Sequence, residues 1–217
     1  MRRPVNYSVS MQTVLFDTNV VFSRLLRDTV VHLHFHEAFR IVWTEDIMAE
    51  LVYRLRRRYP EWNENQVGGV RRNLISAIGD EPITGYPASG HAVMTDPFDS
   101  HLDAAAEHGN VDYVVTMDRK ALVPDPDRTT YEFYHLDEFL VLCDQSMPDR
   151  IRAALLTNLG YHVLRAKRNG RNELPNFPEK YAEAGVPDFA ERVLEHYRRL
   201  DMSKIWNEPP TLANWTG

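Results

Sequence analysis

Short apolar runs alternate with amphipathic stretches through the first two thirds of the chain. Runs rich in β-branched and aromatic residues predict buried strands, and the stretches between them have the three-to-four-residue spacing of helices. The predicted strands cover residues 13–16, 40–43, 111–116 and 131–134, with a possible edge strand near Ile83. The predicted helices cover 20–26, 29–39, 45–58, 63–78, 99–109 and 137–142. Alternating strands and helices predict an α/β fold with a central parallel sheet between helices.

The last third of the chain lacks this alternation. One long helical pattern covers residues 149–167, a polar linker covers 170–178, and a final helix is predicted at 189–200, before an irregular tail from Trp206. We therefore divide the chain into an N-terminal tail at residues 1–11, an α/β domain at 12–145 and an all-helical extension at 146–217.

Composition and charge limit where this protein is expected to be located and what it is expected to bind. The fraction of hydrophobic residues, 43%, is sufficient for a core, and no apolar run approaches the ~20 residues of a membrane helix. The polar start is atypical of a secretory signal, and the single cysteine, Cys143, fits a reducing cytoplasm. A net charge of −6 means that any nucleic acid must bind to a local basic patch.

Acidic residues occur where the predicted elements begin or end. Asp17 directly follows the first strand, Asp118 follows strand 111–116, Glu50 lies one turn into helix 45–58, and Asp99 opens a helix. Asn19 is expected to cap the helix after the first strand. Because the carboxyl ends of parallel strands meet at one edge of a sheet, we expect the four carboxylates to converge there. Such a cluster repels itself unless a hard divalent cation such as Mg²⁺ or Mn²⁺ compensates it, and metal-assisted phosphodiester hydrolysis matches that chemistry.

Four segments together resemble a PIN domain, the nuclease fold of VapC-type toxins. They are Leu-Phe-Asp-Thr-Asn (15–19), Trp-Thr-Glu-Asp-Ile-Met-Ala-Glu-Leu (43–51), Asp-Pro-Phe-Asp-Ser-His-Leu (96–102) and Val-Val-Thr-Met-Asp (114–118). Residues 135–142 and 148–200 also resemble the helical extension of a subset of PIN toxins. The resemblance implies a PIN-like three-layer fold and a ribonuclease with one or two Mg²⁺ or Mn²⁺ ions held by Asp17, Glu50, Asp99 and Asp118. It further implies an RNA substrate, a cognate antitoxin of a type II toxin–antitoxin pair and a homodimer.

Five further residues are expected to support this site: Asn19, Asp96, His101, Asp103 and Thr116. Asp103 stands where relatives with this extension have a small or apolar residue, and it lies one helical turn after Asp99 as a possible additional acid. His101 follows Asp99 by two residues and has either a capping or packing role or a role in proton transfer. After Asp118 the sequence Arg-Lys-Ala-Leu lacks a further acid that is often found there.

Other functions agree less well with these residues. A haloacid-dehalogenase phosphatase needs a second aspartate two residues after the first, and Asn19 cannot transfer that proton. His32, His34 and His36 suggest zinc, but no cysteine or fourth ligand is near them in sequence, so ordinary structural histidines are expected. A catalytically silent PIN module used as a binding scaffold stays the main alternative to an active ribonuclease.

A basic cluster follows Glu50 along the chain. It is interpreted either as a solvated helix face or as a phosphate-binding surface, with Arg54, Arg57 and Arg58 as the RNA-binding candidates. Interleaved aromatic residues could stack bases, or could belong to the core or to a dimer interface. The full set is Arg54, Arg56, Arg57, Arg58, Arg71 and Arg72 with Tyr53, Tyr59 and Trp62, and a weaker cluster on the extension is Arg165, Lys167, Arg168 and Arg171.

Overall fold

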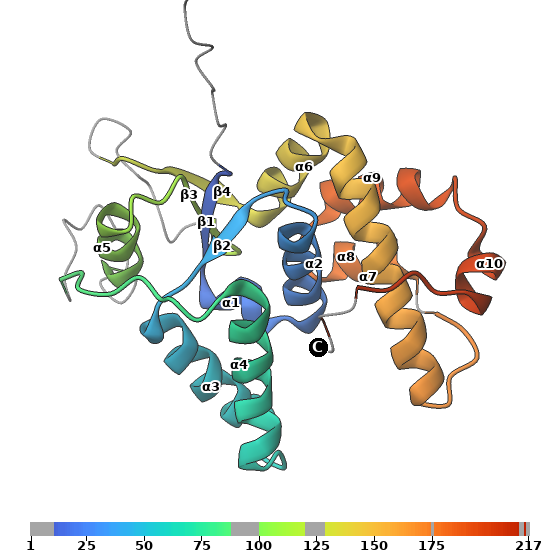
Figure 1. Cartoon of the computed structure of the whole chain (residues 1–217), viewed down its shortest axis with the longest axis horizontal. Helices are drawn as coiled ribbons and strands as arrows, with labels where there is room; N and C mark the ends of the chain where they lie inside the picture. The colour runs from blue at the N-terminus through green and yellow to red at the C-terminus, as the bar shows by residue number, and fades with distance from the viewer. Residues whose placement is uncertain (1–10, 88–99, 120–128, 175, 213–214, 216–217) are drawn as a thin grey trace, which may run out of the picture.

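A four-stranded parallel sheet lies at the centre of the protein (Figure 1). The computed structural model describes residues 11–87, 100–119, 129–174, 176–212 and 215. The strand order is β2-β1-β3-β4, and every pairing is parallel. The strands are β1 (Thr13–Phe16), β2 (Arg40–Val42), β3 (Tyr113–Thr116) and β4 (Glu132–His135). The predicted α/β fold with a parallel sheet is thereby confirmed.

The strand order places a crevice between β1 and β3. The chain passes from β1 to β2 on one side and then crosses to β3 on the other side of β1. In open parallel sheets, ligands bind at the carboxyl ends of the strands where the connections diverge in this way. Val14, Leu15 and Phe16 of β1 are almost fully buried, so this central strand fixes the position of the residues that follow it.

In the described part of the chain, five helices of this domain precede strand β4. They are α1 (Thr18–Phe22), α2 (Arg24–Phe35), α3 (Glu45–Arg58), α4 (Glu64–Ile78) and α5 (Ser100–His108). Helix α3 follows from local sequence, because Thr44 accepts the N–H of Ile47 as its N-cap and basic residues occupy its last turn. In Figure 1, α5 lies on one side of the sheet, and α2 lies on the other.

Aromatic side chains fill the space between the sheet and α6 (Leu136–Ser146). The ring of Phe139 on this helix lies 6.1 Å from that of Phe16 on β1 and 5.5 Å from those of Phe39 and Tyr113. Such tilted pairs add about 0.5–1.5 kcal/mol each beyond simple burial. Helix α6 is therefore part of the core of the α/β domain.

Four helices follow α6 and pack against the body. They are α7 (Pro148–Arg168), α8 (Phe177–Glu183), α9 (Pro187–Tyr197) and α10 (Met202–Asn207). Helix α9 lies against α6, where the buried carboxylate of Asp137 accepts the backbone N–H groups of Asp188 and Phe189 at 3.2 and 2.9 Å. A side chain of α6 thus caps the N-terminus of α9 and attaches the extension.

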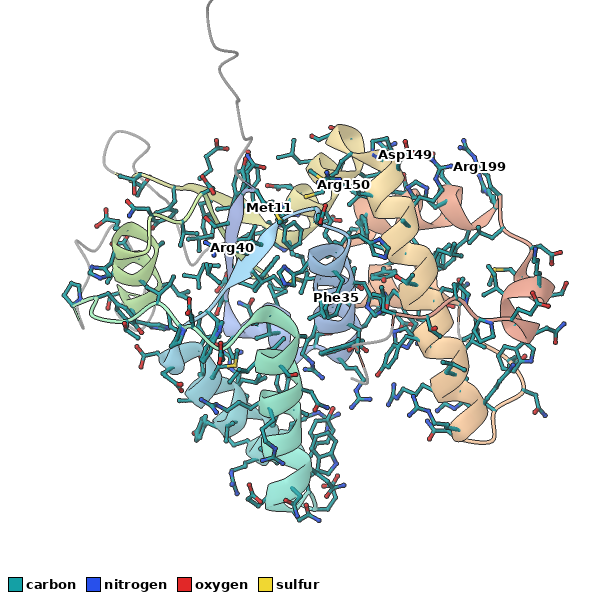
Figure 2. All side chains as sticks on the ribbon, in the orientation of Figure 1. Met11, Phe35, Arg40, Asp149, Arg150 and Arg199 are labelled. Carbon is teal, nitrogen blue, oxygen red and sulfur yellow. The ribbon has the colours of Figure 1, made fainter. Side chains whose placement is uncertain are left out.

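Helix α7 lies against α2 through polar contacts. The hydroxyl groups of Thr29 and Tyr181 lie 2.7 Å apart, and the Asn158 amide donates to both of them. Figure 2 shows Arg150 near the start of α7. Its side chain donates to the carbonyl group of Glu37, just beyond α2. These bonds fix the rotation of α7 on the domain.

Asp28 lies fully buried in the same interface. Among the described residues, neither of its carboxylate oxygens has a hydrogen-bond partner, and the Nε2 atom of His162 lies 3.8 Å from one of them. The indole of Trp215 faces this carboxylate without a hydrogen bond of normal geometry. Burial raises the pKa of Asp28 to about 6, against the opposing charge of Arg27, and burial lowers the pKa of His162 to about 3.

Gly160 permits a close crossing of α7 by the segment after α10. A Cβ atom at this position would lie 1.7 Å from the carbonyl oxygen of Pro210, which is far inside van der Waals contact. Only glycine allows this approach within a helix.

Some boundaries and elements differ from those predicted. Helix α2 begins at Arg24 and ends at Phe35, earlier than the predicted helix 29–39. Ile83 forms no strand, although its N–H donates to the Trp43 carbonyl. Helix α9 is not the last helix, because α10 covers part of the predicted irregular tail. None of the helices in the described ranges has both the length and the apolar character needed to cross a membrane.

Candidate active site

Asp17 occupies the carboxyl end of β1, at the crevice beside β3. Its side chain is buried, and its Oδ2 atom accepts hydrogen bonds from the hydroxyl of Thr116 at 2.7 Å and from the amide of Asn19. Burial raises the pKa of Asp17, the hydrogen bond from Thr116 lowers it, and the negative charge of Glu50 raises it. Asp17 is thus a carboxylate held in an environment that disfavours its charge.

Thr116 connects the ends of β1 and β3. Besides donating to Asp17, its hydroxyl oxygen accepts from the Asn19 amide at 2.9 Å and from the backbone N–H of Asp118 at 3.1 Å. A threonine hydroxyl has one donor and two acceptor sites, and all three are used. Thr116 therefore has no spare hydrogen-bonding capacity, and its rotamer is fixed.

Asn19 has a different role from the predicted helix cap. The N-cap of α1 is Asp17, and Asn19 lies within the helix. Its amide donates to Asp17 and Thr116, and its Oδ1 atom accepts the backbone N–H of Met117 at 2.9 Å. The cap prediction was wrong because the Asn19 side chain bonds to Asp17 and to two residues almost a hundred positions away, Thr116 and Met117.

Glu50 lies beside Asp17 across α1 and α3. Its Oε2 atom accepts from the hydroxyl of the buried Thr18 at 2.8 Å, and its Oε1 atom accepts from Arg54. The effect of its charge on the pKa of Asp17 places the two carboxylates within electrostatic reach. Because Thr18 directly follows Asp17, its hydrogen bond places the Glu50 carboxylate near the end of β1.

The structure describes only some of the other predicted acids. Asp118 is exposed two residues after β3, with its backbone tied to Thr116. Asp99 and Asp96 lie outside the described residues. Among the residues that are described, no group of three or more His, Cys, Asp or Glu side chains is close enough to hold a metal ion. The predicted four-carboxylate convergence therefore stays a prediction.

Two residues of α5 were predicted to support the site. Asp103 is buried and its Oδ1 atom accepts from the hydroxyl of Tyr131 at 2.6 Å, which connects α5 to the segment before β4. His101 is partly buried in the first turn of α5. The Tyr131 contact gives Asp103 a structural role that sequence did not indicate.

The chemistry of the donor set fits a hard divalent cation. Asp17 and Glu50 present oxygen ligands of the kind that Mg²⁺ and Mn²⁺ prefer, with Asp118 at the adjacent strand end. A cation would also offset the burial and the like-charge repulsion that raise the pKa of Asp17. The three histidines of the zinc alternative instead bond within the protein, His32 to the Asp28 carbonyl, His34 to the Phe39 carbonyl and His36 to the Thr157 hydroxyl.

The basic residues after Glu50 divide into two kinds. Arg54 and Arg71 form ion pairs with Glu50 and Glu45 at 2.6 and 2.7 Å. Arg57 and Arg58 instead lie over the rings of Tyr53 and Tyr59, at 5.6 and 5.2 Å. The ring of Tyr59 stacks on that of Trp62, with centroids 4.2 Å apart. The far end of α3 therefore combines exposed cations with partly exposed aromatic faces.

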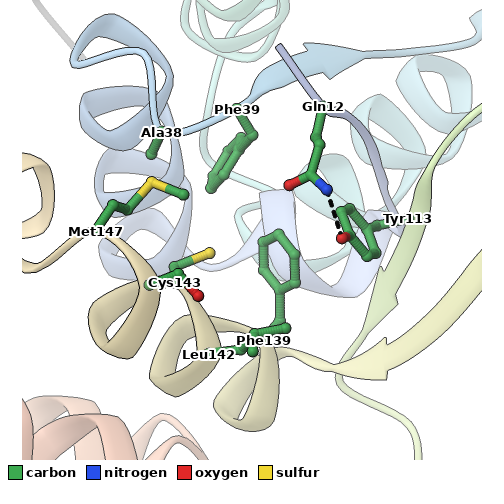
Figure 3. Close-up of a pocket in the computed structure, with 9 residues that line it drawn as sticks. Gln12, Ala38, Phe39, Tyr113, Phe139, Leu142, Cys143 and Met147 are labelled. Carbon is green, nitrogen blue, oxygen red and sulfur yellow. Dashed lines mark hydrogen bonds between the residues drawn. The ribbon is translucent and has the colours of Figure 1, made fainter. Parts of the chain in front are cut away.

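A cavity of about 160 Å³ lies at the opposite end of the sheet (Figure 3). Gln12, Phe39 and Tyr113 line it at the amino ends of the strands, away from Asp17. The thiol of Cys143 is buried beside it, and burial raises the pKa of this thiol to about 12, which disfavours the reactive thiolate. The cavity is separate from the acidic site.

Comparison with known families agrees with this geometry. Residues 13–120 match the family model described as PIN domain. Searches of curated proteins and of solved structures gave no match.

Proposed function

Residues 13–120 of this chain form a PIN domain, and from this premise we propose that the protein is a metal-dependent endoribonuclease that hydrolyses RNA phosphodiester bonds. PIN domains are generally metal-dependent nucleases that act on nucleic acids. The observation that carries the proposal is the position of Asp17, buried at the carboxyl end of β1 and close to Glu50.

The proposed metal ligands are Asp17, Glu50, Asp99 and Asp118, with Mg²⁺ or Mn²⁺ as the ion. When bound, such an ion activates water and stabilises the leaving oxygen of the phosphodiester. Thr116 and Asn19 hold the Asp17 carboxylate in one orientation, and Thr18 does the same for Glu50. Asp96, His101 and Asp103 are proposed to support this arrangement.

The proposed RNA surface begins next to Glu50 and runs along α3. Arg57 and Arg58 supply positive charge on a chain whose net charge is −6, and Tyr53, Tyr59 and Trp62 offer faces on which bases can stack. When the Arg54 side chain breaks its ion pair with Glu50, its guanidinium group adds a further cation to this surface.

The biological role that we propose is the toxin of a type II toxin–antitoxin pair. Support comes from the resemblance of the four acidic segments to VapC-type toxins, which implies a cognate antitoxin, a homodimer and a cytoplasmic location. Inspection of the neighbouring reading frame tests this role first, because a toxin–antitoxin pair requires a small gene for a DNA-binding protein beside this one. Co-expression of such a protein should then restore growth of cells that the chain alone inhibits. Unchanged inhibition by the pair would argue against this role.

One observation favours the alternative of a silent binding scaffold. Both oxygens of Glu50 already have partners within the protein, Thr18 and Arg54. A scaffold of this kind would bind RNA or protein through α3 and would cleave nothing under any divalent ion.

Cleavage of labelled RNA by purified protein tests the enzymatic proposal. Wild type should cleave with Mg²⁺ or Mn²⁺ and stop when EDTA is added, and Asp17→Asn should be inactive while folded. Asp149→Asn on α7 makes the same chemical change at an exposed carboxylate and serves as the matched control. Equal cleavage by Asp17→Asn and wild type would contradict the mechanism.

A further inference from the structure

The ion pair between Glu50 and Arg54 lies directly at the acidic site. The two residues are one turn apart on α3, and both the Nε and Nη2 atoms of Arg54 approach the Oε1 atom of Glu50, at 2.7 and 2.6 Å. Glutamate four residues before a cationic residue is the favourable orientation on a helix. The Thr18 hydroxyl donates to Oε2, so each carboxylate oxygen of Glu50 already accepts a hydrogen bond within the protein.

Arg54 also acts on Asp17. The charge of Arg54 lowers the pKa of Asp17, whereas burial and the charge of Glu50 raise it. The hydrogen bonds that the structure gives to the Asp17 side chain come from neutral groups, the Thr116 hydroxyl and the Asn19 amide. Arg54 therefore supplies positive charge to a pair of carboxylates that repel each other.

We propose that Arg54 is a built-in counter-ion that occupies the place of a divalent cation at Glu50 and competes with that cation for the carboxylate. This role rests on the proposed metal-dependent function. A metal ion about 2.1 Å from Oε1 would lie within a few ångströms of a guanidinium group bound to the same oxygen, and the two cations would repel each other strongly. Metal binding at Glu50 thus requires Arg54 to withdraw.

The side chain of Arg54 can make this movement. It is 41% exposed and is carried on a long flexible stem, so its guanidinium can leave Glu50 without disturbing the core. The next cations along α3, Arg57 and Arg58, lie on the proposed RNA surface. A displaced Arg54 would gain an RNA phosphate as its new partner, since a guanidinium binds phosphate oxygens in the same forked geometry as a carboxylate. Metal and RNA would then bind with positive cooperativity.

Mn²⁺ titration of the full-length protein without RNA tests this role, with electron paramagnetic resonance to count free Mn²⁺. The variant is Arg54→Gln, and the matched control is Arg56→Gln, which removes the same charge from an exposed position on the same helix. We expect Arg54→Gln to bind Mn²⁺ about two- to fivefold more tightly than wild type, the range of a partly exposed ion pair. The control should bind like wild type.

A second measurement follows the melting temperature in EDTA. Without Arg54 the repulsion between Asp17 and Glu50 is uncompensated, so Arg54→Gln should melt at a lower temperature than Arg56→Gln and should gain more on addition of Mn²⁺. Unchanged or weaker Mn²⁺ binding by Arg54→Gln, beside measurable binding by wild type, would overturn the counter-ion role alone. Absence of Mn²⁺ binding in every protein, including wild type, would overturn the proposed metal-dependent function with it.

Discussion

The hydroxyl group of Thr116, the last residue of β3, donates a 2.7 Å hydrogen bond to the Oδ2 atom of Asp17, the first residue after β1. The two strands pair in parallel with Phe16 opposite Val115, so this bond joins their carboxyl ends through side chains. Because the same hydroxyl accepts from Asn19 and from the Asp118 backbone, one side chain sets the relative position of three predicted site residues.

Thr116→Val should therefore reduce RNA cleavage while keeping the shape of the side chain. Valine fills the same volume but cannot donate to Asp17 or accept from Asn19. We expect a loss of about 10- to 100-fold in kcat/KM, as for other residues that orient metal ligands. Thr116→Ser keeps the hydroxyl and should retain most activity. Equal activity of the valine and serine variants would show that the hydrogen bond is dispensable.

The buried Asp28 should lower stability at neutral pH. Its folded pKa of about 6 lies above the unfolded value of 3.8, so ionisation of Asp28 destabilises the folded state. The contribution of Asp28 to the free energy of unfolding is fully present below pH 3.8 and is lost as pH rises through 6. Asp28→Asn should raise the free energy of unfolding by about 2–3 kcal/mol at pH 7 and by little at pH 4. Urea unfolding at both pH values measures the difference.

Two neighbouring histidines provide the opposite pH dependence. Burial lowers the folded pKa of His32 to about 4 and of His162 to about 3, so stability is lost as pH falls below the unfolded value of 6.5. Between pH 6 and 4, the free energy of unfolding should fall less steeply in His162→Gln than in wild type, by about 1.4 kcal/mol per pH unit. An unchanged slope in this variant would show that His162 is protonated in the folded state.

Two glycine substitutions should change stability in opposite directions. Gly160→Ala places a Cβ atom against the Pro210 carbonyl, and the required backbone shift should outweigh the gain of about 1 kcal/mol in helix propensity. Gly69→Ala in α4 meets no atom within 4 Å, so it should stabilise the protein by about 0.5–1 kcal/mol. Thermal or urea unfolding of both variants measures this contrast. Stabilisation by Gly160→Ala would mean that the segment at Pro210 does not cross α7 so closely.

Removal of the arginines at the far end of α3 should weaken RNA binding. The double variant Arg57→Ala, Arg58→Ala removes two cations that lie over aromatic rings, and the slope of log Kd against log salt should fall by about 0.7 for each phosphate group that the protein no longer neutralises. Arg152→Ala on α7 removes an exposed charge elsewhere and is the control. A normal slope in the double variant would redirect the search to Arg165 and its neighbours on the extension.

The elements that depend on local interactions were the ones predicted best from the sequence. Helix α3 covers Glu45–Arg58 as predicted, because Thr44 caps it and Ile47, Leu51 and Leu55 repeat every four residues. Helices α8 and α10 have seven and six residues, too few for a clear periodicity, and they were not predicted. Their stability comes from packing against the rest of the chain.

The candidate site shows the same division. The position of Asp17 followed from the abrupt end of an apolar strand, whereas the hydrogen bond from Thr18 to Glu50 was visible only in the structure. Two partners of Asn19, Thr116 and Met117, and the His162 side chain that faces Asp28 lie at least 97 positions away, which no local pattern contains. The pairing of Glu50 with Arg54 is visible as an i, i+4 spacing, but only the structure shows that it lies beside Asp17.

The contact between Asp28 and Trp215 also concerns the order in which the chain is synthesised. These residues are 187 positions apart (215 − 28), so a ribosome must add 187 residues after Asp28 before the indole can cover the carboxylate. Until then α2 lacks this cover, although every strand of the sheet has already been translated. The nascent chain would therefore complete the surroundings of Asp28 only after α10 has been synthesised, so a late segment finishes a part of the fold that α2 begins.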